Sequence, residues 1–120
     1  MSTFIVDLTT HFLRHCQSER SFSTCTDLGQ DAVAITDNGT LYGTIEFYQK
    51  AMAAGVKPII GVDFYVARES RHLKRARIDT RPHRLVCLAQ NNEGYKNLLD
   101  LSSIGFLEGF YYKPRIDKEV

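Results

Sequence analysis

Two short apolar runs on either side of a helical pattern constrain the fold of this 120-residue chain more than any other feature. Residues 31–37 are almost continuously apolar, which is typical of a strand that is buried on both faces, and residues 57–67 are a second β-rich run with Pro58 at its start. Between them, residues 44–54 carry apolar side chains at helical intervals, and Gly55 follows at the left-handed position where helices commonly end. A strand, a helix and a strand in this order predict one right-handed crossover between two parallel strands.

The flanking segments extend this α/β pattern. Residues 84–89 predict a third strand, and Asn91 or Asn92 is placed to cap a following helix that Gly105 would end. Residues 3–8 are compatible with a strand, and residues 14–27 are assigned to a helix although no sustained apolar stripe marks one. We therefore expect strand–helix units on a parallel sheet or barrel.

In parallel α/β folds, functional groups gather at the C-terminal ends of the strands. Here those ends carry Asp37, Asn38 and Asp63. A buried carboxylate needs a partner, which makes Asp37 and Asp63 candidate ligands for a metal ion. A turn role for Asp37, in which its carboxylate accepts backbone N–H groups, is an equally good interpretation.

Charge and cysteine content exclude several classes of protein. The formal net charge is +1, so any contact with a polyanion must be local. No apolar run is long enough to span a membrane, and the N-terminus lacks the pattern of a signal peptide. Three cysteines without a Cys-x-x-Cys spacing (Cys16, Cys25 and Cys87) fit neither a disulfide framework nor a zinc finger. We expect the three cysteines to be reduced thiols in a cytoplasmic protein.

Two surface features are candidate contact sites. The basic stretch over residues 68–82 offers Arg71, Lys74, Arg75 and Arg77 as contacts for nucleic-acid phosphates, with a solvated polar loop as the alternative because no aromatic residue is present for base stacking. An aromatic group follows at Phe106, Phe110, Tyr111 and Tyr112. If exposed, it would form a contact surface and favour self-association of the chain.

The motifs at residues 31–48, 55–67, 85–98 and 109–117 occur in an order that resembles the PHP (polymerase and histidinol phosphatase) domain at the start of the bacterial replicative DNA polymerase III alpha subunit. The resemblance covers residues 29–120 and leaves residues 1–28 as a divergent start. It implies a single truncated PHP domain over residues 1–120 and part of a distorted (β/α)7 barrel. It also implies a bacterial cytoplasmic location and a parent nucleotidyltransferase that works in DNA replication.

The same resemblance implies a cluster of metal ions, but several ligand positions differ in this chain. Where the family has His-x-His, the chain has Thr9 and His11, and the family's Thr-Asp-His-Gly turn has Asn38 in place of histidine. Asp63 replaces a glutamate, and Arg84 replaces a histidine. His11 and Asp63 are therefore the remnant metal ligands, with Asp37 as a possible addition, and two ligands do not make a catalytic zinc or manganese site.

We therefore expect no catalytic residue and no cofactor, and a scaffold or docking role. The partners implied by the resemblance are the remainder of the alpha subunit and the proofreading exonuclease subunit, with DNA contacted only indirectly and no membrane. The alternative is a metal-dependent phosphoesterase or 3′–5′ exonuclease that uses zinc, manganese or magnesium. A third hypothesis is a free-standing interaction module from a split or rearranged gene.

Overall fold

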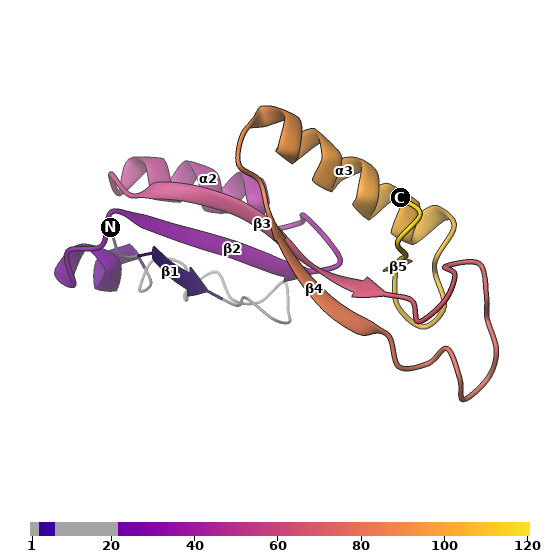
Figure 1. Cartoon of the computed structure of the whole chain (residues 1–120). Coiled ribbons are helices and arrows are strands. Elements are labelled where there is room, and N and C mark those ends of the chain that lie inside the picture. The colour runs from indigo at the N-terminus through magenta and orange to yellow at the C-terminus, as the bar shows by residue number, and fades with distance from the viewer. Residues whose placement is uncertain (1–2, 7–21) are drawn as a thin grey trace.

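An open five-stranded sheet organises the part of the chain that the computed structural model describes, residues 3–6 and 22–120 (Figure 1). Four strands are ordered β1-β2-β3-β4, and β5 also pairs with β3. The element bounds are β1 Thr3–Val6, β2 Ala32–Asn38, α2 Thr44–Ala53, β3 Lys57–Val66, β4 His83–Leu88, α3 Asn92–Leu107 and β5 Arg115–Ile116. Residues 22–27 add a short helix. The chain is thus a mixed α/β structure with a partly parallel sheet.

The predicted crossover forms the centre of this sheet. Strands β2 and β3 run parallel, with Ala32 opposite Lys57 and Asn38 opposite Asp63. Strand β1 adds a further parallel neighbour on the other edge of β2. The side chains of β2 from Ala32 to Thr36 are buried, as its apolar sequence predicts.

Strand β4 corrects the expectation that all strands are parallel. It pairs with β3 in the antiparallel direction, with Gly61 opposite Leu88 and Val66 opposite His83. A parallel strand needs a crossover that returns the chain to the start of the sheet. The connection over residues 67–82 contains no helix and returns the chain directly alongside β3 (Figure 1).

Strand β5 gives β3 a third partner. It pairs in parallel with the last residues of β3, where Tyr65 lies opposite Arg115 and Val66 opposite Ile116. Because β4 occupies one edge of β3 over this stretch, β5 lies on the edge that β2 occupies up to Asp63. The C-terminal segment therefore extends the sheet beyond the end of β2.

The helix boundaries follow local sequence signals at most ends. Gly55 has a φ of 71° after the end of α2, and the Asn91 side chain caps α3 by accepting a hydrogen bond from the Gly94 N–H at 2.9 Å. Gly105, in contrast, does not end α3, which continues to Leu107. It is buried, and a Cβ at this position would lie 3.4 Å from Pro114. That separation is an ordinary van der Waals contact, so the structure gives Gly105 neither a capping role nor a steric requirement for glycine.

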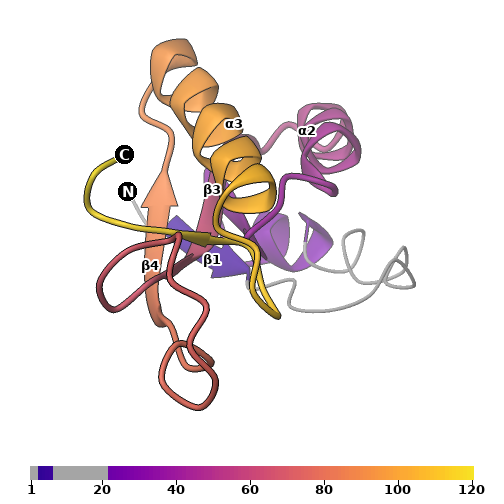
Figure 2. The ribbon, with the colours of Figure 1, turned by 90° about the vertical axis from the view of Figure 1, so that its right-hand side faces the viewer.

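Helices α2 and α3 cover the same face of the sheet (Figures 1 and 2). One core cluster packs Val33 and Ile35 of β2 against Phe47 of α2 and the helical residues 22–27. A second cluster packs Val62 and Phe64 of β3 with Leu98 of α3 and Ile116 of β5. Since side chains alternate along a strand, the intervening residues face away from the helices.

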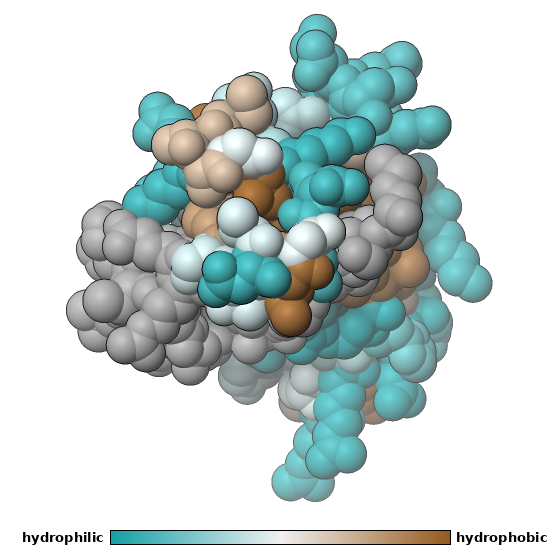
Figure 3. All heavy atoms as spheres, turned by 90° about the vertical axis from the view of Figure 1, so that its left-hand side faces the viewer, coloured by the Kyte–Doolittle hydropathy of each residue, from teal (hydrophilic) through white to brown (hydrophobic). Residues whose placement is uncertain are grey.

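Apolar side chains also reach the surface. Among the aromatic group near the C-terminus, Tyr112 is 73% exposed, Phe106 and Phe110 are also exposed, and Tyr111 is half-buried. Around residues 22–27 and α2, hydrophobic side chains are interrupted by hydrophilic ones (Figure 3). In the part of the chain that the structure describes, no helix is both long and apolar enough to cross a bilayer.

Two predictions concern the N-terminal residues. The strand assigned to residues 3–8 is confirmed for Thr3–Val6, and the helix assigned to residues 14–27 is confirmed for 22–27. Residues 7–8 and 14–21 lie outside the described part of the chain.

Cys25 and Cys87 are free thiols, and burial raises the pKa of both.

Candidate functional site at the ends of the parallel strands

Four side chains share the sheet face opposite the helices, close to the ends of β2 and β3. The register places Asn38 beside Asp63, and Tyr65 beside Arg84. Val62 and Phe64 pack into the helix-covered core, so Asp63 and Tyr65 face the other way. The antiparallel direction of β4 matters here, because it brings the start of that strand to the C-terminal end of β3.

The Arg84 guanidinium joins the polar groups of this face. Its Nε donates a hydrogen bond to Asp63 Oδ1 at 3.0 Å, and its Nη2 donates to Asp63 Oδ2 and to Asn38 Oδ1. The Asp63 side chain is 12% exposed and the Arg84 side chain 45%. A fork that contacts both oxygens of a carboxylate is the strongest ordinary form of ion pair.

Tyr65 supports two cations beside this pair. The Arg84 Cζ lies over the ring at 5.3 Å from its centroid, and Lys113 Nζ lies over it at 4.6 Å. Lys113 also donates a hydrogen bond to the Tyr65 hydroxyl at 3.3 Å. An aromatic face attracts cations through its quadrupole, so Tyr65 fixes where the Arg84 side chain lies.

Asp37 has different surroundings from Asp63. It is the neighbour of Asn38 in β2, so alternation directs its side chain to the helix-covered face. There its Oδ2 accepts a hydrogen bond from the Gly43 N–H at 3.1 Å, next to the start of α2. This contact is the turn interaction that the sequence favours as one of two roles for Asp37. The strand alternation thus separates two carboxylates that the sequence places together.

The turn after β2 is held on three sides. Gly39 has a φ of 66°, its N–H donates to the Asp63 carbonyl at 2.9 Å, and its own carbonyl accepts from Ser102 Oγ at 3.2 Å. A Cβ at this position would lie 2.9 Å from Pro114. Glycine is therefore required both by the backbone conformation and by the close approach.

The described residues of this face do not form a set of metal ligands. Both Asp63 oxygens accept hydrogen bonds from Arg84, and Asn38 offers only a neutral amide oxygen to the same guanidinium. Within residues 3–6 and 22–120, no three His, Cys, Asp or Glu side chains form a group that could hold a metal. A catalytic zinc site uses three protein ligands. His11, the other predicted remnant ligand, lies outside these residues.

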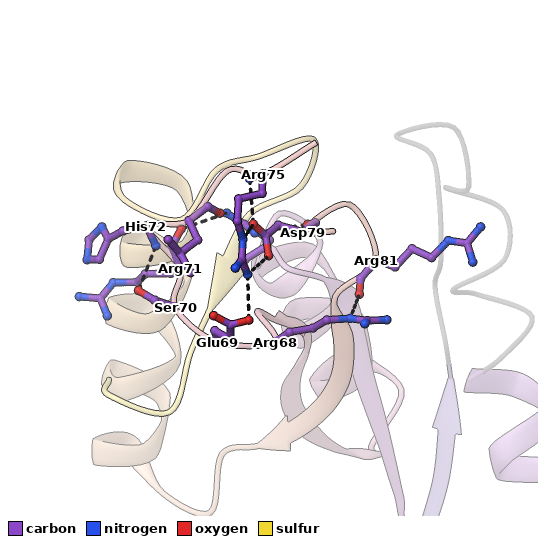
Figure 4. Close-up of polar contacts among 10 residues, drawn as sticks. Arg68, Glu69, Ser70, Arg71, His72, Arg75, Asp79 and Arg81 are labelled. Atoms are coloured by element: carbon purple, nitrogen blue, oxygen red, sulfur yellow. Dashed lines mark hydrogen bonds and ion pairs between the residues drawn. The ribbon is translucent and has the colours of Figure 1, made fainter. Parts of the chain in front are cut away.

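The basic loop between β3 and β4 contains the predicted nucleic-acid contacts, and two of them have carboxylate partners; Figure 4 shows those of Arg75. Arg71 donates to Asp117 through its backbone N–H at 2.8 Å and its Nη1 at 2.9 Å, and to Glu108 through Nε at 2.7 Å. Arg75 donates to both oxygens of Asp79, at 2.9 and 3.0 Å, and to Glu69 at 2.9 Å. Within the described residues, Lys74 and Arg77 are exposed and form no ion pair.

These ion pairs shift the titration of two buried carboxylates. The hydrogen bonds from the Arg75 side chain lower the pKa of Asp79 to about 2. Burial opposes ionisation of Asp117, but hydrogen bonds from the Arg71 and Glu119 backbones and the Arg71 guanidinium outweigh it and lower the pKa of Asp117. Both carboxylates therefore remain charged well into the acidic range.

Arg115 is a structural centre that sequence reasoning missed. It is 1% exposed, and its guanidinium donates to four backbone carbonyls, those of Gly109, Asp79, Arg71 and Leu73, at 2.8–3.3 Å. Three of these carbonyls belong to the basic loop. The sequence could have indicated this role, because Arg115 is a charged residue between Pro114 and Ile116. A charge buried in such a position must find several polar partners.

Comparison of the sequence with known proteins identifies the family of this chain. A model of the PHP domain matches residues 15–120, and the chain therefore belongs to the PHP domain family. Its PHP domain matches the N-terminal region of DNA polymerase III alpha subunits.

Three relatives illustrate this relationship. The chain is 54% identical over 91 residues to the DNA polymerase III subunit alpha of Thermus aquaticus, which covers 74% of the chain and 8% of that protein. It is 52% identical over 88 residues to the subunit of Borreliella burgdorferi, with 72% and 8% covered. It is 45% identical over 103 residues to that of Treponema pallidum, with 85% and 9% covered. The chain thus spans less than a tenth of the length of these relatives.

Proposed function

We propose that this chain is the N-terminal PHP-domain portion of a bacterial DNA polymerase III alpha subunit, with a catalytically degenerate site and a scaffold or docking role in DNA replication. The observation that carries the proposal is the position of Arg84, whose guanidinium contacts Asp63 and Asn38. The family membership supports the parent protein, and the strand-end geometry supports the loss of metal chemistry.

An arginine in this position acts as a permanent replacement for a metal ion. Its guanidinium stays protonated at all accessible pH values, so it neutralises Asp63 without any bound cation. A divalent ion would have to displace it and would meet its positive charge at close range. The site is therefore proposed to stabilise the strand ends instead of activating water.

Exposed apolar side chains support a docking role. On β4, Val86 and Leu88 are 49% and 44% exposed and lie on the same face of the sheet, whereas Leu85, which is 51% exposed, lies on the other face. At the end of α3, Leu107 is 85% exposed and lies near the exposed Phe106 and Phe110. Contiguous exposed apolar surface marks contact sites. We propose that the remainder of the alpha subunit and the proofreading exonuclease subunit use these surfaces.

Metal analysis tests the degenerate site. The chain is purified without chelator, its zinc, manganese and magnesium contents are measured, and hydrolysis of an aryl phosphate ester is assayed with each metal added. We expect less than stoichiometric metal and no metal-dependent hydrolysis. Stoichiometric metal together with hydrolysis would overturn the proposal in favour of a metal-dependent phosphoesterase or exonuclease.

A matched pair of substitutions tests the docking surface. Leu107→Glu places a charge at the exposed end of α3, whereas Leu28→Glu does the same at a leucine that is 66% exposed and follows the helical residues 22–27. Binding to a purified proofreading exonuclease subunit is measured by fluorescence anisotropy. We expect only Leu107→Glu to weaken this binding. Equal effects of the two substitutions would show that the exposed end of α3 is not the docking surface.

A further inference from the structure

The loop between β3 and β4, residues 67–82, concentrates positive charge that the rest of the chain lacks. It contains six Lys or Arg and two Asp or Glu, which gives +4 with His72 neutral. The whole chain carries +1, so the remaining residues carry −3. An anion that approaches the molecule is therefore attracted to this loop and repelled elsewhere.

The arginines of the loop fall into two groups according to their partners. Arg71 and Arg75 are neutralised by carboxylates, as described above. Arg68, Arg77 and Arg81 are exposed and form no ion pair with any residue that the structure describes. The second group holds the charge that remains available to a ligand.

These three arginines line one hollow. The hollow has a volume of about 440 Å³ and is lined by Arg68, Arg77, Ile78, Thr80 and Arg81, with no acidic side chain among them. Arg68 Nε donates to the Arg81 carbonyl at 3.4 Å, which joins the two ends of the loop. In Figure 4, the Arg68 side chain extends towards Arg81 and away from the cluster of Arg75 and Asp79.

The backbone that presents Arg77 is fixed from both sides. The Arg75 N–H donates to Asp79 Oδ2 at 2.8 Å, and the Asp79 N–H donates to the Arg75 carbonyl at 3.0 Å. Arg77 lies between these two residues with a φ of 66°, in the left-handed region. Arg115 holds the same turn through the Asp79 carbonyl. A ligand would therefore meet a turn that is already ordered, which lowers the entropic cost of binding.

We propose that the hollow of Arg68, Arg77 and Arg81 binds phosphate groups of a DNA backbone. Guanidinium groups match phosphate oxygens with paired N–H donors, and the Thr80 hydroxyl adds a neutral donor of the kind that contacts phosphates. Phosphate contacts carry no information about the bases, so the proposed contact is independent of sequence. The choice of DNA as the source of the phosphates rests on the proposed function.

The test measures binding of the whole 120-residue chain to a fluorescein-labelled DNA duplex at increasing salt. The double variant Arg77→Asn/Arg81→Gln removes two charges, and asparagine tolerates the left-handed conformation of residue 77. We expect weaker binding and a salt dependence, log K against log salt, whose slope is smaller by about 1.8, since each lost phosphate contact changes it by about 0.9.

The control Lys57→Gln/Lys96→Gln removes the same charge from two exposed lysines outside the loop, and it should leave the slope nearly unchanged. Equal slopes for the two double variants, or no measurable binding of the parent chain, would overturn the proposal. If the double variant fails to fold by circular dichroism, the single Arg81→Gln variant carries the same test with an expected change of about 0.9.

A competition arm identifies the source of the phosphates. Sodium pyrophosphate is added to the DNA complex and compared with sodium chloride at equal ionic strength. We expect the two salts to displace DNA equally, and selective displacement by pyrophosphate would reject DNA in favour of a free phosphate ligand. Neither result bears on metal content or ester hydrolysis, so the proposed function stands or falls separately.

Discussion

Arg84 and Asp63 lie diagonally across the antiparallel ladder of β4 and β3, and the guanidinium donates to both oxygens of the carboxylate. The direct partner of Asp63 in the ladder is Val86, two residues after Arg84. Diagonal neighbours on one face are within reach of a long side chain. The antiparallel pairing of β4 therefore creates this ion pair.

Replacing Arg84 should leave the mostly buried Asp63 carboxylate without its donor. We expect Arg84→Met to lower the free energy of unfolding by about 1–2 kcal/mol, a moderate value because the arginine itself is partly exposed. Urea denaturation followed by circular dichroism measures the change. Arg81→Met, at an exposed arginine without an acidic partner, serves as control, and an equal loss in both variants would argue against the pair.

Restoring imidazoles at two strand-end positions should create a metal site. In Asn38→His/Arg84→His, two histidines join Asp63, which gives three donors in place of a carboxylate held by a guanidinium. We expect this variant to bind zinc about tenfold more tightly than the parent chain, as measured by calorimetry. Asn38→Gln/Arg84→Gln breaks the same contacts without adding a ligand. Zinc binding by this control at the same affinity would contradict the interpretation.

Loss of the buried Arg115 side chain should release the basic loop. We expect Arg115→Met to cost about 3 kcal/mol or more, because four backbone carbonyls lose a charged donor. Limited trypsin digestion should then cleave within residues 67–82 first. Lys118→Gln, at an exposed lysine close by in sequence, should leave both stability and cleavage unchanged. Resistance of the loop in Arg115→Met would show that other contacts hold it.

Acid should weaken the fold through Asp79. Its pKa is about 2 in the folded chain, below the ordinary value of 3.8. The ion pair therefore contributes fully above pH 3.8, and its contribution is lost as the pH falls from there towards about 2. The unfolding temperature is measured from about pH 5 to about pH 2. As the pH falls, it should decrease more steeply for the parent chain than for Asp79→Asn. Asp117 adds a dependence of the same sign, so the variant keeps part of the slope.

The matched control for this titration is Asp100→Asn, which removes an exposed carboxylate of α3. It should keep the full acid dependence of the parent chain. If Asp79→Asn and Asp100→Asn lose stability with identical slopes, the contacts between Arg75 and Asp79 do not contribute to acid stability.

Local signals predicted the parts of the fold that local chemistry decides. The crossover of β2, α2 and β3, the left-handed Gly55 and the Asn91 cap all follow from residues close together in sequence. The direction of β4 did not, because it depends on how a long loop returns to the sheet. The end of α3 was also missed, because Gly105 lies inside the helix and not at its end.

In the candidate site, too, local sequence predicted some features, whereas others depend on contacts between distant residues. Sequence position indicated that Asn38 and Asp63 lie at neighbouring strand ends, and the register confirms this. It could not show that Asp37 turns to the other face and contacts Gly43. It also could not show which arginines of the loop have carboxylate partners, because Asp117 and Glu108 lie far along the chain.

Strand β3 is hydrogen-bonded to β2, β4 and β5, and every pairing except that of β1 with β2 passes through it. Between Gly61 and Asp63 it has a neighbour on both edges. These amides have no frayed edge from which the ladder could open, so they exchange with solvent only when the sheet comes apart as a whole. Their exchange rate would therefore report the global stability of the chain, whereas the amides of β4 on its outer edge would report only local breathing.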